Sequence, residues 1–412
     1  MLDQIGTNAR TCVRMEPLFV VPFSMYTTYA SVYMVKLHVT YTELGLITSL
    51  NLILQMFSAF ISGFLTDRLG RRKALWMCDI ISWSVATLVW AISQNFWWFV
   101  VAATINGFQR VSVTAWYCLL VEDTPAEKRT NVFTGLQIVS VIGGIFAPIG
   151  GILVGYFSVV PATRIMYAFA CVSMSSMIYF RHRGLHETDI GLRKMQERTK
   201  FLWRKDIQEY WIILKQILDN RPLLLLFAVY VLWNVQATIR TTFLSVYQVN
   251  YLHIPTALIS AFPAVSSVAM MILLLTVIPR FREEQAARLM NVGFALLILA
   301  QVILVWMPSG SFVWVVVSTA FAAAGTIIAN PYVESVVANA MDDENRATML
   351  SVLNVLILAF TSPAGIIGGW TYSINPQIPM YLVAGVFLIS IGFVWWAKRA
   401  SHRVQPAPAP AK

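Results

Sequence analysis

Long apolar segments dominate this sequence and limit what it can fold into. Twelve of them follow one another, and each is long enough to cross a bilayer, which takes about 20 mostly apolar residues in a helix. They fall at 17–35, 43–66, 73–93, 97–121, 130–157, 161–181, 222–250, 255–279, 286–307, 311–338, 346–372 and 377–398. A backbone inside lipid must satisfy its own hydrogen bonds, so we expect each segment to be an α-helix.

Composition agrees with a membrane protein. Only 12% of the residues are charged, whereas soluble domains typically carry about 25%. The net charge of +10 does not indicate nucleic-acid binding, because the positive residues lie between apolar segments and not on one basic face. The four cysteines are isolated, so neither a disulfide nor a metal site is expected. A β-barrel is excluded, because its strands are short and alternate in polarity.

Lysine and arginine positions predict the orientation. With the N-terminus inside, only Lys36 and Arg164 of the 30 Lys and Arg residues fall in outside loops, and Arg110 and Arg240 lie within apolar segments. Cytoplasmic loops carry an excess of positive residues. We therefore expect a multi-pass membrane protein with both termini in the cytoplasm.

A charged connection divides the chain into two halves of six segments each. It becomes amphipathic around Trp211 and Ile212, which predicts a helix on the membrane surface. Acidic residues end the fourth and tenth segments, and Pro and Gly recur in the fifth and eleventh, so we expect two pseudo-symmetric bundles. The predicted organisation is an N-terminus at 1–16, a bundle at 17–181, a linker at 182–221, a bundle at 222–399 and a disordered tail at 400–412.

A short motif stands between the second and third segments. It reads Gly63-Phe-Leu-Thr-Asp67-Arg68-Leu-Gly70-Arg71-Arg72-Lys73. This resembles the G-x-x-x-D-R-x-G-R-R-K signature of the major facilitator superfamily, twelve-helix type. The resemblance implies an all-α fold of two six-helix bundles that moves a small solute by alternating access. It also implies a monomer in the inner membrane of the cell, without enzymatic activity, cofactor or metal.

The same resemblance implies that the motif is a gating latch. Its arginines are expected to pair with the acids that end the fourth segment, Glu122 or Asp123. Simple anchoring of the loop by positive charge is the alternative. The predicted gating residues are Gly63, Asp67, Arg68, Gly70, Arg71, Arg72 and Asp123.

Polar residues inside the first, fourth, seventh and tenth segments are the substrate-site candidates, because the resemblance places these segments around a central cavity. They are Tyr26, Tyr29, Asn106, Arg110, Gln236, Arg240 and Asn330. Ionisable groups at lipid depth are costly and commonly functional. Since arginine binds anions through two parallel hydrogen bonds, we expect an organic anion. The alternative is that one or both arginines are structural and pair with a carboxylate or with carbonyl oxygens.

Other functions remain open at this point. Gly143-x-x-x-Ala147-Pro148-x-x-Gly151 partly matches an element of drug–proton antiporters, so proton-coupled efflux of amphipathic compounds is an alternative. A ligand sensor on the same fold is another. Glu334 is the candidate for binding a coupling proton, because it continues a stripe through Asn330. The chain lacks a phosphate-binding loop for ATP and a cluster of nucleophilic or metal-binding residues, so neither a pump nor an enzyme is expected.

Overall fold

The computed structural model describes residues 5–197, 211–212, 215, 218–219, 221–276, 286–339 and 346–404. The predicted tail at 400–412 and the surface helix in the linker fall largely outside these residues. Within them, the regular secondary structure is helical throughout. Ten helices are long and apolar enough to cross a membrane. The expected all-α membrane fold is therefore confirmed.

The N-terminal half contains the first six predicted segments. Its elements are α1 Thr7–Met15, α2 Pro17–Lys36, α3 Tyr41–Leu69, α4 Arg71–Asp79, the π-helical turn η2 Ile80–Val85, α5 Ala86–Ile92, α6 Phe96–Asn106, α7 Gln109–Val121, η3 Ala126–Lys128, α8 Arg129–Ile145, α9 Pro148–Phe157 and α10 Val159–Gly184. Gly107 and Phe108 separate α6 from α7 within one segment. Pro148 begins α9 and separates it from α8 in another, because proline favours the first turn of a new helix.

The C-terminal half follows the linker helix α11 Asp189–Gln196. Its elements are α13 Arg221–Val246, η4 Tyr247–Tyr251, η5 Thr256–Leu258, α14 Ala261–Thr276, α15 Ala286–Trp306, α16 Phe312–Asn339, α17 Arg346–Thr361, α18 Pro363–Ile374 and α19 Ile378–Val404. Pro363 separates α17 from α18 as Pro148 separates α8 from α9. A proline therefore interrupts the helix in corresponding segments of the two halves.

Two of the twelve predicted segments are not among the ten candidate spans. The segment of α6 and α7 is broken into helices of 11 and 13 residues. Helix α10 is 26 residues long but carries several polar side chains and three basic residues in its last turn. Both lie at their predicted positions in the chain, so the twelve-helix count stays a prediction for these two segments.

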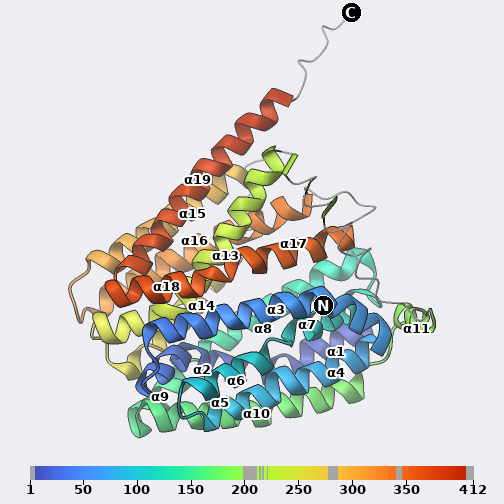
Figure 1. The fold of residues 1–412 in the computed structure, drawn as a ribbon, viewed down its shortest axis with the longest axis horizontal. Coiled ribbons are helices and arrows are strands. Elements are labelled where there is room, and N and C mark those ends of the chain that lie inside the picture. The colour runs from blue at the N-terminus through green and yellow to red at the C-terminus, as the bar shows by residue number, and fades with distance from the viewer. Residues whose placement is uncertain are drawn as a thin grey trace, which may run out of the picture.

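The helices have two ends, which we name by their loops. The linker end carries the loop between α3 and α4 and the end of α10, and the far end carries the turns that follow α2, α9 and η4. In Figure 1 the N-terminal half lies below the C-terminal half, and α3 runs beside α17 and α18. Helices α13 and α19 rise away from α3 in the same view.

Close contacts join the two halves at the far end. The Tyr29 hydroxyl donates a hydrogen bond to the backbone oxygen of Thr256 at 3.0 Å. The hydroxyls of Thr42 and Ser373 lie 3.0 Å apart, and the Asn250 amide donates to the Tyr41 hydroxyl at 3.2 Å. The structure therefore has its halves joined at the far end.

Glycine allows α3 and α18 to approach closely there. A Cβ atom on Gly45 would lie 2.2 Å from the backbone oxygen of Gly365, so any side chain requires the helices to separate. No described atom lies within 4 Å of a Cβ built on Gly63 of the same helix, so the close approach of α3 lies at Gly45 and not at the glycine of the signature motif.

Substituting Gly45→Ala should open the far end. Overpacking of this kind typically costs about 1–3 kcal/mol, which corresponds to a shift of roughly 5–150-fold between two conformations. Cysteines introduced at Thr42 and Ser373 should cross-link more slowly in the Gly45→Ala background. Gly385→Ala is the control, because no described atom lies within 4 Å of a Cβ at Gly385. Unchanged cross-linking in Gly45→Ala would contradict the expectation.

Candidate functional site

The signature motif forms an ion-paired turn at the linker end. Gly70 has a φ of 83°, a left-handed conformation that favours glycine, and it separates α3 from α4. The Arg71 guanidinium bonds the Asp67 carboxylate at 2.8 Å and the Glu122 carboxylate at 3.3 Å. Of the two acids that the sequence offered as partners, the structure brings Glu122 to Arg71. These contacts lie entirely within the N-terminal half.

The linker also contacts this turn. The Glu187 carboxylate accepts hydrogen bonds from the backbone N–H groups of Arg71 at 2.9 Å and Arg72 at 3.1 Å. A carboxylate at this position favours the start of α4, where backbone N–H groups lack partners within the helix. The hydroxyl of Thr188 bonds Glu122. Sequence analysis missed Glu187, because it lies far from the motif in the chain.

The side chains of the remaining predicted gating residues have other partners. Arg72 donates from its guanidinium to the backbone oxygen of His182, and Arg68 lies over the ring of Phe64 at 5.7 Å. Asp123 accepts from the backbone N–H of Asn8 at 2.9 Å, at the start of α1. The structure thus places Asp123 with the N-terminal helix and not with the arginines of the motif.

A chain of amides holds Arg110 inside the N-terminal half. The Arg110 Nε donates to Gln55 at 2.9 Å, and Gln55 donates to Asn51 at 2.7 Å. Asn51 in turn donates to Asn106 at 3.2 Å, and Asn106 donates to the backbone oxygen of Ser82 at 2.9 Å. The structure therefore brings the predicted residues Asn106 and Arg110 together. Sequence analysis missed Asn51 and Gln55, although two amides one helical turn apart in an apolar segment are a usable signal.

Arg110 is directed toward the other half of the molecule. The phenol of Tyr230, on α13, lies close enough to act electrostatically on the Arg110 guanidinium. The two terminal nitrogens of Arg110 have no hydrogen-bond partner among the described residues. Arg110 is consequently a cation at the interface of the halves, held in place by a neutral side chain.

Arg240 is the second cation, ten residues beyond Tyr230 on α13 and so about 15 Å farther along the helix. Within the described part of the chain it has no hydrogen-bond or ion-pair partner. Gln236, one turn away, donates to the backbone oxygen of Trp233 at 2.9 Å, and its buried Oε1 lacks a described partner. Asn330 is half-buried on α16. The Glu334 side chain lies outside the described part.

The two predicted tyrosines have different surroundings. Tyr26 is buried within the N-terminal half, with its ring centroid 4.6 Å from that of Tyr167. It therefore belongs to the packing of the bundle, and the structure does not bring it to the arginines. Tyr29 reaches across to Thr256 in the far-end contact. Helical spacing placed both residues on α2 but did not specify which neighbours they face.

The structure contains a buried ion cluster whose members sequence analysis did not bring together. The Arg181 guanidinium bonds Glu16 at 2.8 Å and Asp79 at 3.4 Å, and Ser112 bonds Asp79. The side chains of Glu16, Asp79 and Arg181 are only 14%, 6% and 6% exposed. The sequence placed Glu16 in the cytoplasmic N-terminus and Arg181 at the cytoplasmic end of the sixth segment, where charged side chains commonly lie in water.

The fifth segment uses its glycines for packing. The Ser24 hydroxyl donates to the backbone oxygen of Gly143 at 2.8 Å, joining α2 to α8. A Cβ on Gly144 would lie 2.1 Å from the Ser267 hydroxyl oxygen, and one on Gly151 would lie 2.3 Å from the backbone oxygen of Ala257. The contacts of Gly143 and Gly151 show that the small residues of the partial antiporter element allow close helix packing.

Two helical halves that meet beside a buried arginine, Arg110, form the architecture expected of a secondary membrane transporter. A family model described as the Major Facilitator Superfamily matches residues 18–365. The chain belongs to this superfamily, as the motif at Gly63–Lys73 predicted.

Solved transporters share the fold along almost the whole chain. The nucleoside transporter NupG aligns with a TM-score of 0.67 at 15% identity, covering 96% of this chain and 98% of its own. A POT family transporter in complex with 5-aminolevulinic acid gives 0.68 at 13% identity, with 96% of each chain covered. The human organic anion transporter MFSD10 (TETRAN) gives 0.66 at 16% identity, covering 94% and 99%. Such identities establish the fold alone. No curated protein matches the sequence.

Proposed function

We propose that this secondary transporter carries a small organic anion, and that Arg110 and Arg240 bind it. The strongest support comes from Arg240. It is a cation at lipid depth that has no hydrogen-bond or ion-pair partner in the described part of the chain. An uncompensated charge in a low-dielectric interior is costly. A bound anion offsets that cost, whereas a lipophilic cation increases it.

Arg110 is suited to the same role. Gln55 occupies its Nε, and the two terminal nitrogens stay available to a ligand. A guanidinium can bind a carboxylate or phosphate through two parallel hydrogen bonds, which fixes the orientation of the ligand. A structural pairing of Arg110 with a carboxylate has no support, because its partner is the amide oxygen of Gln55. A structural role through that carbonyl oxygen is the alternative that the ligand test below distinguishes.

Transport in this proposal alternates between two conformations that open at opposite ends. The far-end contacts of Tyr29, Thr42 and Gly45 must break in the other conformation. The ion pairs of Arg71 hold the turn of the signature motif in the present one. We place both termini in the cytoplasm and the protein in the inner membrane as a monomer, on the distribution of Lys and Arg and on the family.

The test is a thermal-shift panel on the purified protein, followed by counterflow in liposomes. The panel holds carboxylate and phosphorylated anions, sugars and lipophilic cations. A ligand present at about 100 times its Kd should stabilise the folded protein by roughly 2.7 kcal/mol. Anions that stabilise the protein and exchange across liposomes would support the proposal. Stabilisation by lipophilic cations alone would favour efflux, and binding without exchange would favour a sensor; either result would refute it.

A further inference from the structure

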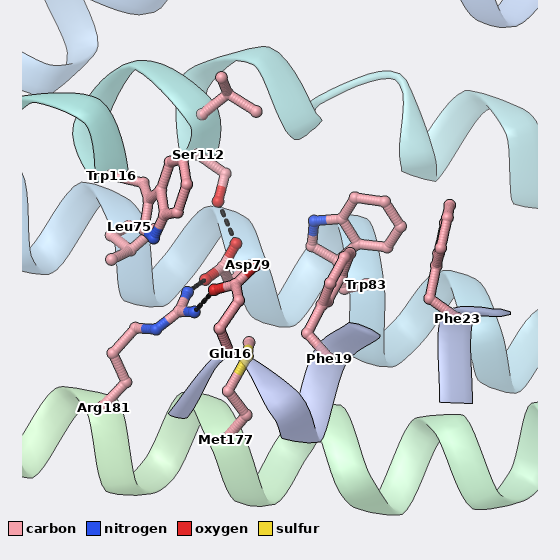
Figure 2. A pocket seen from close by; sticks show the side chains of 11 residues that line it. Glu16, Phe19, Phe23, Leu75, Asp79, Trp83, Ser112, Trp116, Met177 and Arg181 are labelled. Atoms are coloured by element: carbon pink, nitrogen blue, oxygen red, sulfur yellow. Dashed lines mark hydrogen bonds and ion pairs between the residues drawn. The ribbon is translucent and has the colours of Figure 1, made fainter. Parts of the chain in front are cut away.

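Three ionisable side chains meet inside the N-terminal half, near the linker end. Figure 2 shows the carboxylates of Glu16 and Asp79 directed toward the guanidinium of Arg181, with the Ser112 hydroxyl on the other side of Asp79. The four residues come from the start of α2, from α4, from α10 and from α7. Helices distant in the chain thus bring together two acids and one base.

The cluster carries an uncompensated negative charge when both acids are ionised. One guanidinium balances one carboxylate. Arg72 and His182 line a small pocket together with Asp79 and Arg181, but among the described residues neither forms an ion pair with Glu16 or Asp79, and Arg72 donates to the His182 backbone oxygen. The other groups that face the cluster are Cys12 from α1, Glu16 from the α1–α2 junction, Cys78 and Asp79 from α4, Ser112 from α7 and Arg181 from α10. Two carboxylates at one buried site do not readily ionise together. Binding one proton makes the cluster neutral.

A cavity of about 260 Å³ adjoins the cluster. The aromatic side chains of Phe19, Phe23, Trp83 and Trp116 line it beside Glu16 and Asp79 (Figure 2). Its volume is several times the roughly 30 Å³ that one water occupies in the liquid. The polar groups of its lining are those of Glu16, Asp79, Ser112, Arg181 and the two tryptophans, so a water that enters the cavity finds hydrogen-bond partners at the carboxylates.

We propose that Glu16 and Asp79 bind one exchangeable proton between them, and that this proton is coupled to transport. The coupling part rests on the proposed function. Helix α7 connects the two sites, since Ser112 bonds Asp79 while Arg110, two residues earlier, bonds Gln55 on α3. A change in the charge of Asp79 therefore acts on the helix that holds Arg110.

Infrared titration of the purified protein tests the proton site directly. The wild type should show the carbonyl band of a protonated carboxylic acid that appears and disappears within about pH 4–9. In Glu16→Gln or Asp79→Asn the remaining acid forms a one-to-one pair with Arg181, so no proton is needed and the band should vanish in both. Glu197→Gln is the control, because the Glu197 side chain is half exposed and, among the described residues, pairs only with Lys194 on the surface.

Other results decide between the proposals. A band that is absent from the wild type, or that persists in both variants, overturns the proton site. If either variant fails to fold, the other provides the test. In liposomes the variants should still exchange anion but lose accumulation driven by a pH gradient, and undiminished accumulation overturns the coupling. If the wild type carries no anion but its band behaves as expected, the proton site stands and the anion proposal fails.

Discussion

Replacing Arg240 by glutamine is expected to abolish anion-induced stabilisation. Removing one partner of a buried, hydrogen-bonded charge pair costs about 2–5 kcal/mol, which weakens binding roughly 30-fold to several thousand-fold. Arg240 has no described protein partner that competes with the ligand for its charge. The loss of affinity in Arg240→Gln should therefore lie in the upper part of this range. Thermal shift with the anion that binds the wild type best measures it.

The same variant should fold at least as well as the wild type in the absence of ligand. Glutamine removes a buried charge that no described residue compensates, and relief of that cost favours the folded state. This expectation separates a ligand-binding arginine from a structural one. A lower unfolding temperature of ligand-free Arg240→Gln, together with retained anion binding, would make Arg240 structural.

Two variants serve as controls. Arg240→Lys keeps the charge but not the two-pronged geometry, so anion binding should be intermediate. Arg164→Gln removes an arginine that donates to the Tyr33 hydroxyl at 3.3 Å and the Ser93 backbone oxygen at 3.0 Å. It should reduce stability and leave anion binding unchanged. The reverse pattern for Arg164 and Arg240 would refute the anion site.

The positions of the membrane-spanning helices were predictable from the sequence, because a helix that crosses lipid must be long and apolar. A bilayer requires long apolar helices, so the apolar runs mark the helices directly. The motif at Gly63–Lys73 was sufficient to predict the superfamily, and the family match over residues 18–365 confirms it. Pro148 and Pro363 marked the points where one helix ends and the next begins, because proline has no backbone N–H to continue the helical hydrogen bonds.

Side-chain partners were much less predictable. Helical periodicity gives the direction of a residue relative to its own helix but not the helix that lies opposite. Tyr26 and Tyr29 therefore looked equivalent, although one packs in a bundle and the other joins the halves. Glu16 and Arg181 each end an apolar segment and lie far apart in the chain, so only the fold brings them together.

Substituting Arg181→Gln should be among the most destabilising single changes in the N-terminal half. It leaves Glu16 and Asp79 buried side by side without their cation, and breaking a buried ion pair in this way typically costs about 3–5 kcal/mol. The unfolding temperature in detergent should fall sharply at neutral pH. Since protonation removes the charge of both acids, the folded variant binds protons that the unfolded chain releases, and its stability should recover as the pH falls.

The combined variant Glu16→Gln/Asp79→Asn/Arg181→Gln separates charge from packing. Removing every charge of the cluster at once leaves no buried ion without a partner, unlike the removal of one member. We therefore expect the triple variant to regain most of the stability that Arg181→Gln loses, and to show little of its dependence on pH. If the triple variant is as unstable as Arg181→Gln, the Arg181 side chain acts mainly through packing. The excess negative charge of Glu16 and Asp79 would then not be what governs this site.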